Sequence, residues 1–126
     1  MLLDNIVLMI NECELPTKYT FMYSADSDHA DNTIVLTEYG GAPLIGDTAL
    51  AASRYVQLRL RHGKAKQGYK DVWTIYNRLV TLSEWRNEDF WMQLNIPGIP
   101  LPIGLDKKGR QNYVLNMRII TNCKEE

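Results

Sequence analysis

A strict alternation of apolar and polar residues between positions 56 and 61 is the feature that most constrains the fold. The six residues in order are Val56, Gln57, Leu58, Arg59, Leu60 and Arg61. Successive side chains of an extended strand point to opposite faces of a sheet, so the alternation predicts a strand with one apolar and one polar face. Another layer of the fold must cover the apolar face.

Two segments have the apolar spacing of amphipathic helices. Residues 2–14 place apolar side chains three and four positions apart, and Pro16 soon ends this segment because proline cannot continue the hydrogen-bond ladder of a helix. Residues 65–82 show the same spacing more regularly, with the charged side chains largely off the apolar face. We expect these two helices to cover the sheet.

Three further segments alternate as strands do. They are residues 33–39, which are rich in β-branched and aromatic side chains, and residues 90–96 and 113–121. Residues 17–23 alternate loosely and are a weaker candidate for a short strand. The proline-rich segment 97–104 is expected to be a rigid loop, and its interleaved aliphatic side chains indicate that it packs onto another surface.

These elements predict an α+β fold in the order helix, two strands, helix, two strands. The expected architecture is a four-stranded, mainly antiparallel sheet with two helices on one face, since short connections favour antiparallel neighbours. Gly40–Gly41 should end the strand 33–39, residues 42–52 should form a long irregular connection, and 107–109 should form a turn. A chain of this length is expected to be one domain, residues 1–126.

The charge balance argues against a protein that holds nucleic acid through phosphate contacts. The chain has 14 Lys and Arg against 15 Asp and Glu, a net charge of −1 and a pI of about 6.1, whereas such contacts need an excess of basic side chains. No apolar run reaches the roughly 18 residues of a membrane span. Residues 1–5 lack the basic region of a signal peptide, so we expect the product to stay in the cytosol.

No constellation of residues predicts catalysis, a metal site or a cofactor. The acidic stretch 26–31 lacks the turn glycine of a calcium loop and has Thr37 where the bidentate glutamate should stand, so it is expected to be a solvated loop. The other candidate ligands and nucleophiles are His29, His62, Cys13 and Cys123. Neither histidine has zinc-site spacing, and the cysteines are expected to be free thiols in a reducing compartment.

Arginine and tryptophan residues favour contacts with other proteins. Arg59 and Arg61 lie on the polar face of their strand, and Arg118 has the same place on the last strand. The chain also has three tryptophans, and both residue types are enriched at interface hot spots. The alternative is that the tryptophans belong to the core and the arginines face solvent. As a group, these residues indicate an interaction protein.

Three segments resemble, in order, the motifs of a family of small phage minor capsid proteins. Residues 34–43 read IVLTEYGGAP and resemble the family signature Val-Leu-x-Glu-Tyr-Gly-Gly-x-Pro-Pro, with Leu44 in place of a second proline. Residues 54–61 read RYVQLRLR and are similar to its central Val-Gln-Val-x-Val-Arg strand. Residues 101–116 read LPIGLDKKGRQNYVLN and resemble its C-terminal Pro-x-x-x-x-Asp-x-x-Gly-Arg stretch.

Members of that family resemble the tail terminator or tail-completion proteins of long-tailed phages. The resemblance implies a non-enzymatic virion protein, assembled in the host cytoplasm, whose copies form a ring, expected to be a hexamer, on the head-proximal end of the tail tube. The ring would stop tube growth and contact the tail tube protein and the stopper protein of the head connector. DNA would pass through it without specific binding, and no membrane is involved.

The resemblance also implies roles for particular residues. Arg59, Arg61 and Arg118 would form ion pairs between subunits or line the DNA channel. Four further residues belong to a loop expected to contact a neighbouring copy or an adjacent ring: Asp106, Lys107, Lys108 and Arg110. Two alternatives stay open, namely another connector component such as a stopper or adaptor, and a cytoplasmic α+β binding module or enzyme.

Overall fold

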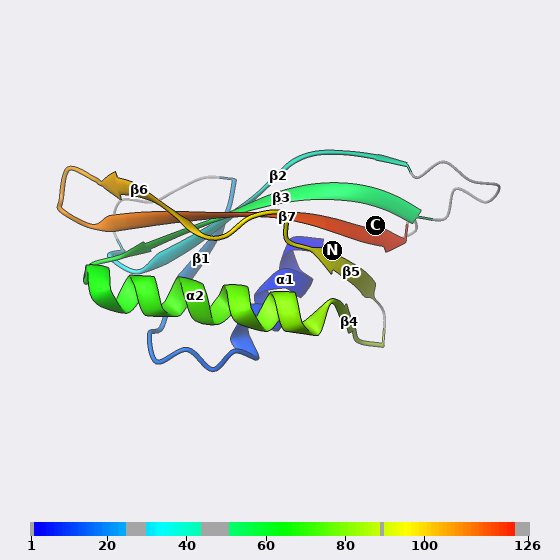
Figure 1. The fold of residues 1–126 in the computed structure, drawn as a ribbon, viewed down its shortest axis with the longest axis horizontal. Helices are drawn as coiled ribbons and strands as arrows, with labels where there is room; N and C mark the ends of the chain where they lie inside the picture. The colour runs from blue at the N-terminus through cyan, green and yellow to red at the C-terminus, as the bar shows by residue number, and fades with distance from the viewer. Residues whose placement is uncertain (1, 25–29, 44–50, 89, 123–126) are drawn as a thin grey trace.

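A computed structural model describes residues 2–24, 30–43, 51–88 and 90–122. These residues form two helices, α1 (Leu2–Asn11) and α2 (Ala65–Leu82), and seven strands (Figure 1). The strands are β1 (Thr20–Tyr23), β2 (Thr33–Pro43), β3 (Ala51–His62), β4 (Glu84–Arg86), β5 (Trp91–Asn95), β6 (Leu101–Leu105) and β7 (Gln111–Asn122). Most of the acidic stretch 26–31, the middle of the connection 42–52 and Cys123 lie outside the described residues.

All seven strands join one mixed sheet. The strand order is β1-β2-β3-β7-β5-β4, and β6 also pairs with β7. The long strands β3 and β7 pair antiparallel along their whole lengths, and β5 and β6 pair with different parts of β7, at residues 118–121 and 111–114. β1 runs parallel to β2, and every other pair is antiparallel. β3 and β7 therefore form the centre of the sheet.

The expected four-stranded sheet is wrong, because the chain forms a seven-stranded mixed sheet that curves as a half-barrel with the two helices. β4 has only three residues, too few to show an alternation in the sequence. β6 contains Pro102, which led us to expect a loop, but an edge strand tolerates a residue without a backbone N–H. The parallel direction of β1 was not foreseen, since alternation reports which face is buried and not the direction of pairing.

Both helices lie on one face of the sheet (Figure 1). The alternation on β3 is confirmed, because Val56, Leu58 and Leu60 are fully buried in the core that the helices cover. α2 approaches the sheet closely at Gly68, where a Cβ atom would lie only 2.8 Å from Cβ of His62. Burial of this apolar face is the main source of the stability of the fold.

The predicted helix 65–82 is confirmed, and the first helix is shorter than the predicted 2–14. Ser83 caps the C-terminal end of α2, with a φ of +55° and its backbone N–H donated to the carbonyl oxygen of Leu79. The strand expected to end at Gly40–Gly41 instead continues to Pro43, with a bulge between Glu38 and Gly40. Among the described residues, no helix combines the length and hydropathy needed to cross a membrane.

Candidate protein-interaction site

Arg59 and Arg61 project from the face of the sheet that the helices leave uncovered. Their neighbours Leu58 and Leu60 are fully buried on the helix side, so the alternation of β3 directs both arginines the other way. Arg61 pairs in register with Asn112 on β7, near the start of that strand. The pairing of β3 with β7 therefore places both arginines beside the turn that joins β6 to β7.

This turn is organised by the carboxylate of Asp106. Oδ1 accepts hydrogen bonds from the backbone N–H groups of Lys108 and Arg110, both at 2.9 Å, and Oδ2 accepts one from Nε of Arg110 at 2.8 Å. Gly109 has a φ of +76°, a conformation that only glycine adopts at little cost. These hydrogen bonds lower the pKa of the Asp106 carboxyl group, and the largest effect comes from the backbone N–H of Arg110. The turn thus carries an ionised carboxylate.

The guanidinium groups of Arg61 and Arg110 meet at the carbonyl oxygen of Ala30. Nη2 of Arg61 donates to this oxygen at 2.6 Å and Nη1 of Arg110 at 3.2 Å. Nη1 of Arg110 also lies 3.4 Å from Oδ1 of Asp31, and both arginines are buried. The carboxylates of Asp31 and Asp106 offset part of the repulsion between the two cations. The segment before β2 is thereby attached to β3 and to the β6–β7 turn.

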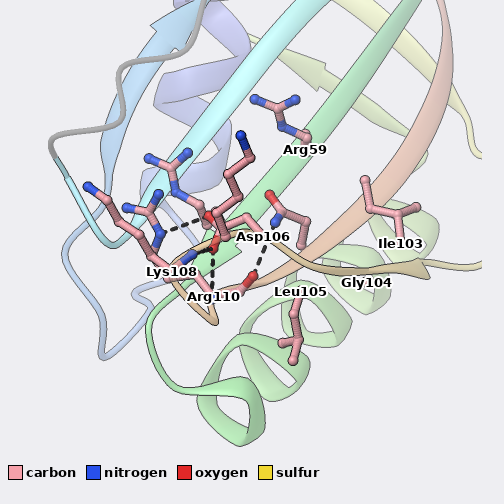
Figure 2. A pocket seen from close by; sticks show the side chains of 10 residues that line it. Arg59, Ile103, Gly104, Leu105, Asp106, Lys108 and Arg110 are labelled. Atoms are coloured by element: carbon pink, nitrogen blue, oxygen red, sulfur yellow. Dashed lines mark hydrogen bonds and ion pairs between the residues drawn. The ribbon is translucent and has the colours of Figure 1, made fainter.

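These side chains border a hollow of about 560 Å³ between β3 and the β6–β7 hairpin (Figure 2). Its lining residues are Arg59, Arg61, Ile103, Gly104, Leu105, Asp106, Lys107, Lys108, Arg110 and Asn112. Five of these ten residues are Lys or Arg and one is acidic, so the lining attracts anionic groups. The hollow brings together six of the seven residues that the sequence singled out, from two segments that the sequence analysis treated separately.

Arg118, the seventh of these residues, lies outside the hollow. It pairs in register with Tyr55 on β3 and Asn95 on β5, farther along β7 than the hollow. Its Nε donates a hydrogen bond to Oγ of Ser53 at 2.9 Å. Arg118 shares the uncovered face with Arg59, as the alternation predicts, but it does not belong to the cluster around the hollow.

Four exposed aliphatic side chains, here named the apolar strip although they do not share one side, lie in and just before β6 at the edge of the hollow. The side chains of Ile99, Leu101, Ile103 and Leu105 are between 53% and 64% exposed. Ile103 and Leu105 point to opposite sides of the strand (Figure 2). The sequence indicated that these aliphatic side chains pack onto another surface, and within the described part of the chain they do not. Apolar edge strands readily associate with other chains, which makes the strip a second candidate contact surface.

The tryptophans contribute mainly to packing within the chain. Trp85 is buried and donates its indole N–H to Glu12 at 2.9 Å. Trp73 is partly buried and packs edge-on against Tyr76, with ring centroids 5.2 Å apart. Trp91 is also partly buried. The core alternative is therefore the better interpretation of Trp73 and Trp85, whereas Trp91 does not belong to the core cluster.

A second polar cluster lies near the start of α2. The backbone N–H of Lys64 donates to Nδ1 of His62 at 2.8 Å, so the proton of the neutral ring lies on Nε2, which is 3.0 Å from Oγ1 of Thr17. Tyr19 donates its hydroxyl to the buried Asp71 at 2.5 Å. Burial lowers the pKa of His62, and burial together with Asp71 raises that of Tyr19. These groups bond to one another, which indicates a structural role.

No metal centre is evident in the part of the chain that the structure describes, where three or more His, Cys, Asp or Glu side chains nowhere converge. Of the two cysteines, Cys13 is described, and it is a partly buried free thiol. Burial raises its pKa, which keeps the thiol protonated and unreactive near neutral pH. The candidate site is therefore the positive hollow with its apolar strip.

The comparison with known protein families identifies the chain. Residues 7–122 match the family described as bacteriophage tail terminator protein, a range that contains the whole hollow, the apolar strip and Arg118. No curated protein matches the chain. The match covers most of the 126 residues and confirms the family indicated by the three sequence motifs. The chain belongs to the bacteriophage tail terminator proteins, a family of structural components of the phage tail.

Proposed function

We propose that copies of this chain form a ring that caps the head-proximal end of the tail tube. The ring stops tube polymerisation and joins the tail to the head connector, and each copy acts as a single domain assembled in the host cytoplasm. The family match over residues 7–122 is the observation that supports this proposal most strongly. The function is one of binding, with no catalytic step.

Two surface features support assembly with other protein chains. The positive hollow attracts carboxylates, and the apolar strip on β6 gains free energy when another chain covers it. They lie side by side, since Ile103 and Leu105 belong to both. A closed ring needs different surfaces of each copy to meet, and a surface of this mixed character suits one side of such a contact.

The arginines on the uncovered face have two candidate roles in the ring. Arg59 forms ion pairs with a neighbouring copy, whereas Arg61, which was expected to do the same, is buried and bonded to Ala30 and Thr33 within its own chain. Arg118, which lies apart from them, either forms such a pair or faces the channel. DNA passes through the channel without specific binding. The net charge of −1 supports passage, because tight binding of the phosphate backbone needs an excess of basic side chains.

The purified protein tests this proposal alone and with the tail tube protein of the same phage. Light scattering gives the mass of the free protein, and negative-stain microscopy shows the tube ends. We expect rings, or caps at one end of each tube, with uncapped tubes of the tube protein alone as the control. A monomer that never binds tubes contradicts the terminator function. Binding to the head connector and not to tubes indicates a stopper or adaptor instead.

A further inference from the structure

We propose that the hollow between β3 and the β6–β7 hairpin receives an acidic surface of a second copy of this chain. That surface, here named the acidic end, consists of Glu12, Glu84 and Glu88. The inference rests on the proposed ring and specifies the contact between its subunits. Each copy then offers the hollow to one neighbour and the acidic end to the other.

Two hydrogen bonds connect the parts of the chain that carry the three glutamates. Glu12, just after α1, accepts a hydrogen bond from the indole of Trp85 in β4 at 2.9 Å. Asn87, just after β4, donates to Asn5 in α1 at 2.9 Å. Both contacts attach α1 to the segment 84–88, which carries Glu84 and Glu88.

The carboxylates of the acidic end are exposed to solvent. Glu84 accepts a hydrogen bond from Trp91, which lowers the pKa of the carboxyl group and keeps it ionised. It also pairs with Arg86 at 3.3 Å, but the two side chains are 49% and 69% exposed, so solvent screens this ion pair. Glu12 and Glu88 are also exposed. The acidic end is complementary in charge to the hollow.

The hollow and the segment 84–88 lie near opposite ends of α2 (Figure 1). α2 begins near the hollow, because Gly68 contacts His62 and Tyr113, the chain neighbours of two lining residues. α2 ends at Leu82, directly before β4, as Figure 1 shows. A helix of 18 residues is about 27 Å long, so the two surfaces are well separated. A head-to-tail contact between them is heterologous and therefore builds a ring or a filament rather than an isolated dimer.

The apolar strip favours a protein occupant over DNA. Ile103 and Leu105 line the hollow and are more than half exposed, and a phosphate backbone offers no apolar surface to cover them. On the other side of the proposed contact, Leu8 of α1 lies about one helical turn before Glu12, and its side chain is 49% exposed. The two surfaces therefore match in apolar character as well as in charge.

Charge reversal tests the contact. In one variant, Lys107→Glu with Lys108→Glu reverses two exposed charges of the hollow. A second variant adds Glu84→Lys and Glu88→Lys and thereby restores complementarity with the signs exchanged. The control, Lys66→Glu with Lys70→Glu, makes the same charge change on exposed positions of α2 outside the hollow. Thermal unfolding of each variant verifies that it is folded.

We expect the first variant to lose self-association by at least tenfold, the fourfold variant to regain it, and the control to behave as the wild type. Sedimentation velocity measures this on free protein, and the fraction of capped tube ends measures it if rings form only on tubes. Unchanged assembly of the first variant, or no recovery in the fourfold variant, overturns the contact. The proposed function survives that result, whereas a wild type that neither assembles nor caps tubes refutes the function itself.

Binding of a short fluorescent DNA duplex tests the alternative that the hollow contacts DNA. We expect it to bind the wild type and the Lys107→Glu, Lys108→Glu variant equally weakly, because the occupant of the hollow is protein. If this variant loses DNA binding while it keeps normal assembly, the hollow is a DNA contact and the inferred subunit contact is wrong.

Discussion

At the scale of single residues, the buried guanidinium of Arg110 connects parts of the chain that are far apart in sequence. It pairs with Asp106 in its own turn at 2.8 Å and with the backbone and side chain of residues 30–31 at 3.2 and 3.4 Å. A buried cation that loses its anionic partners is costly, and so are anions and carbonyls that lose the cation. The shape of the hollow therefore depends on this one side chain.

Replacement of Arg110 tests this role. Arg110→Ala should lower the free energy of unfolding by about 2 kcal/mol, because it removes hydrogen bonds in which the donor is charged. Urea denaturation measures the change. The exposed neighbour is the control, since Lys107→Ala should stay within about 0.5 kcal/mol of the wild type. Equal stability of both variants contradicts the structural role of Arg110.

Protonation of His62 should make stability depend on pH. Burial lowers the pKa of His62 in the folded state from its ordinary value of 6.5, so the unfolded state binds the proton first as the pH falls. The contribution of His62 is fully present above pH 6.5 and is lost as the pH falls through the folded pKa. Urea denaturation at pH values from 6.5 down to the folded-state pKa should show that the free energy of unfolding of the wild type decreases as the pH falls. His62→Gln should reduce this dependence on pH. An identical slope in both proteins refutes the assignment.

At the scale of elements, the sequence predicts those whose burial pattern is long and regular. The helix at α2 was predicted with its observed bounds, and the alternation that identified the strands covers half of β3 and most of β7. β4 is too short to carry a pattern, and β6 was mistaken for a loop because Pro102 obscures its strand character. Pairing direction and sheet order depend on contacts between distant segments, which periodicity does not record.

Close packing of α2 against the sheet makes Gly68 an exception to helix propensity. Alanine normally stabilises a helix interior relative to glycine by up to about 1 kcal/mol. Here the added Cβ would lie 2.8 Å from Cβ of His62 and 3.3 Å from Cε2 of Tyr113. Gly68→Ala should therefore destabilise the protein by about 1–3 kcal/mol, and thermal unfolding measures this. Thr81→Ala, at an exposed position of α2, is the control, and a more stable Gly68→Ala variant contradicts the packing described here.

At the scale of the whole molecule, the candidate site arises from the pairing of strands distant in sequence. In the sequence, Arg59 and Arg61 form one candidate set and the segment 106–110 another, and nothing in the residue pattern joins them. The register that places Arg61 opposite Asn112 brings the two sets around one hollow. Arg118 has the same strand position as the first set in the sequence, but the length of β7 separates it from them. The sequence indicates the chemistry of the candidate side chains, whereas their positions relative to one another depend on the register of the sheet.

The net charge of −1 conceals an uneven distribution that suits assembly. Positive charge gathers around the hollow, and carboxylates gather at the acidic end beyond the other end of α2. A contact between two different surfaces of a subunit builds a ring where its rotation closes, and a ring that covers the end of a tube leaves no site for the next tube subunit. We propose that this chain stops tube growth by such a cap.

Elongation of preformed tubes tests this claim most directly. Tubes are incubated with the purified protein, tail tube protein carrying a fluorescent label is added, and microscopy records growth at each end. The account predicts that growth stops at one end of each tube and that the Lys107→Glu, Lys108→Glu variant, which cannot form the ring contact, fails to stop it. Continued growth at both ends in the presence of excess wild-type protein would contradict the account.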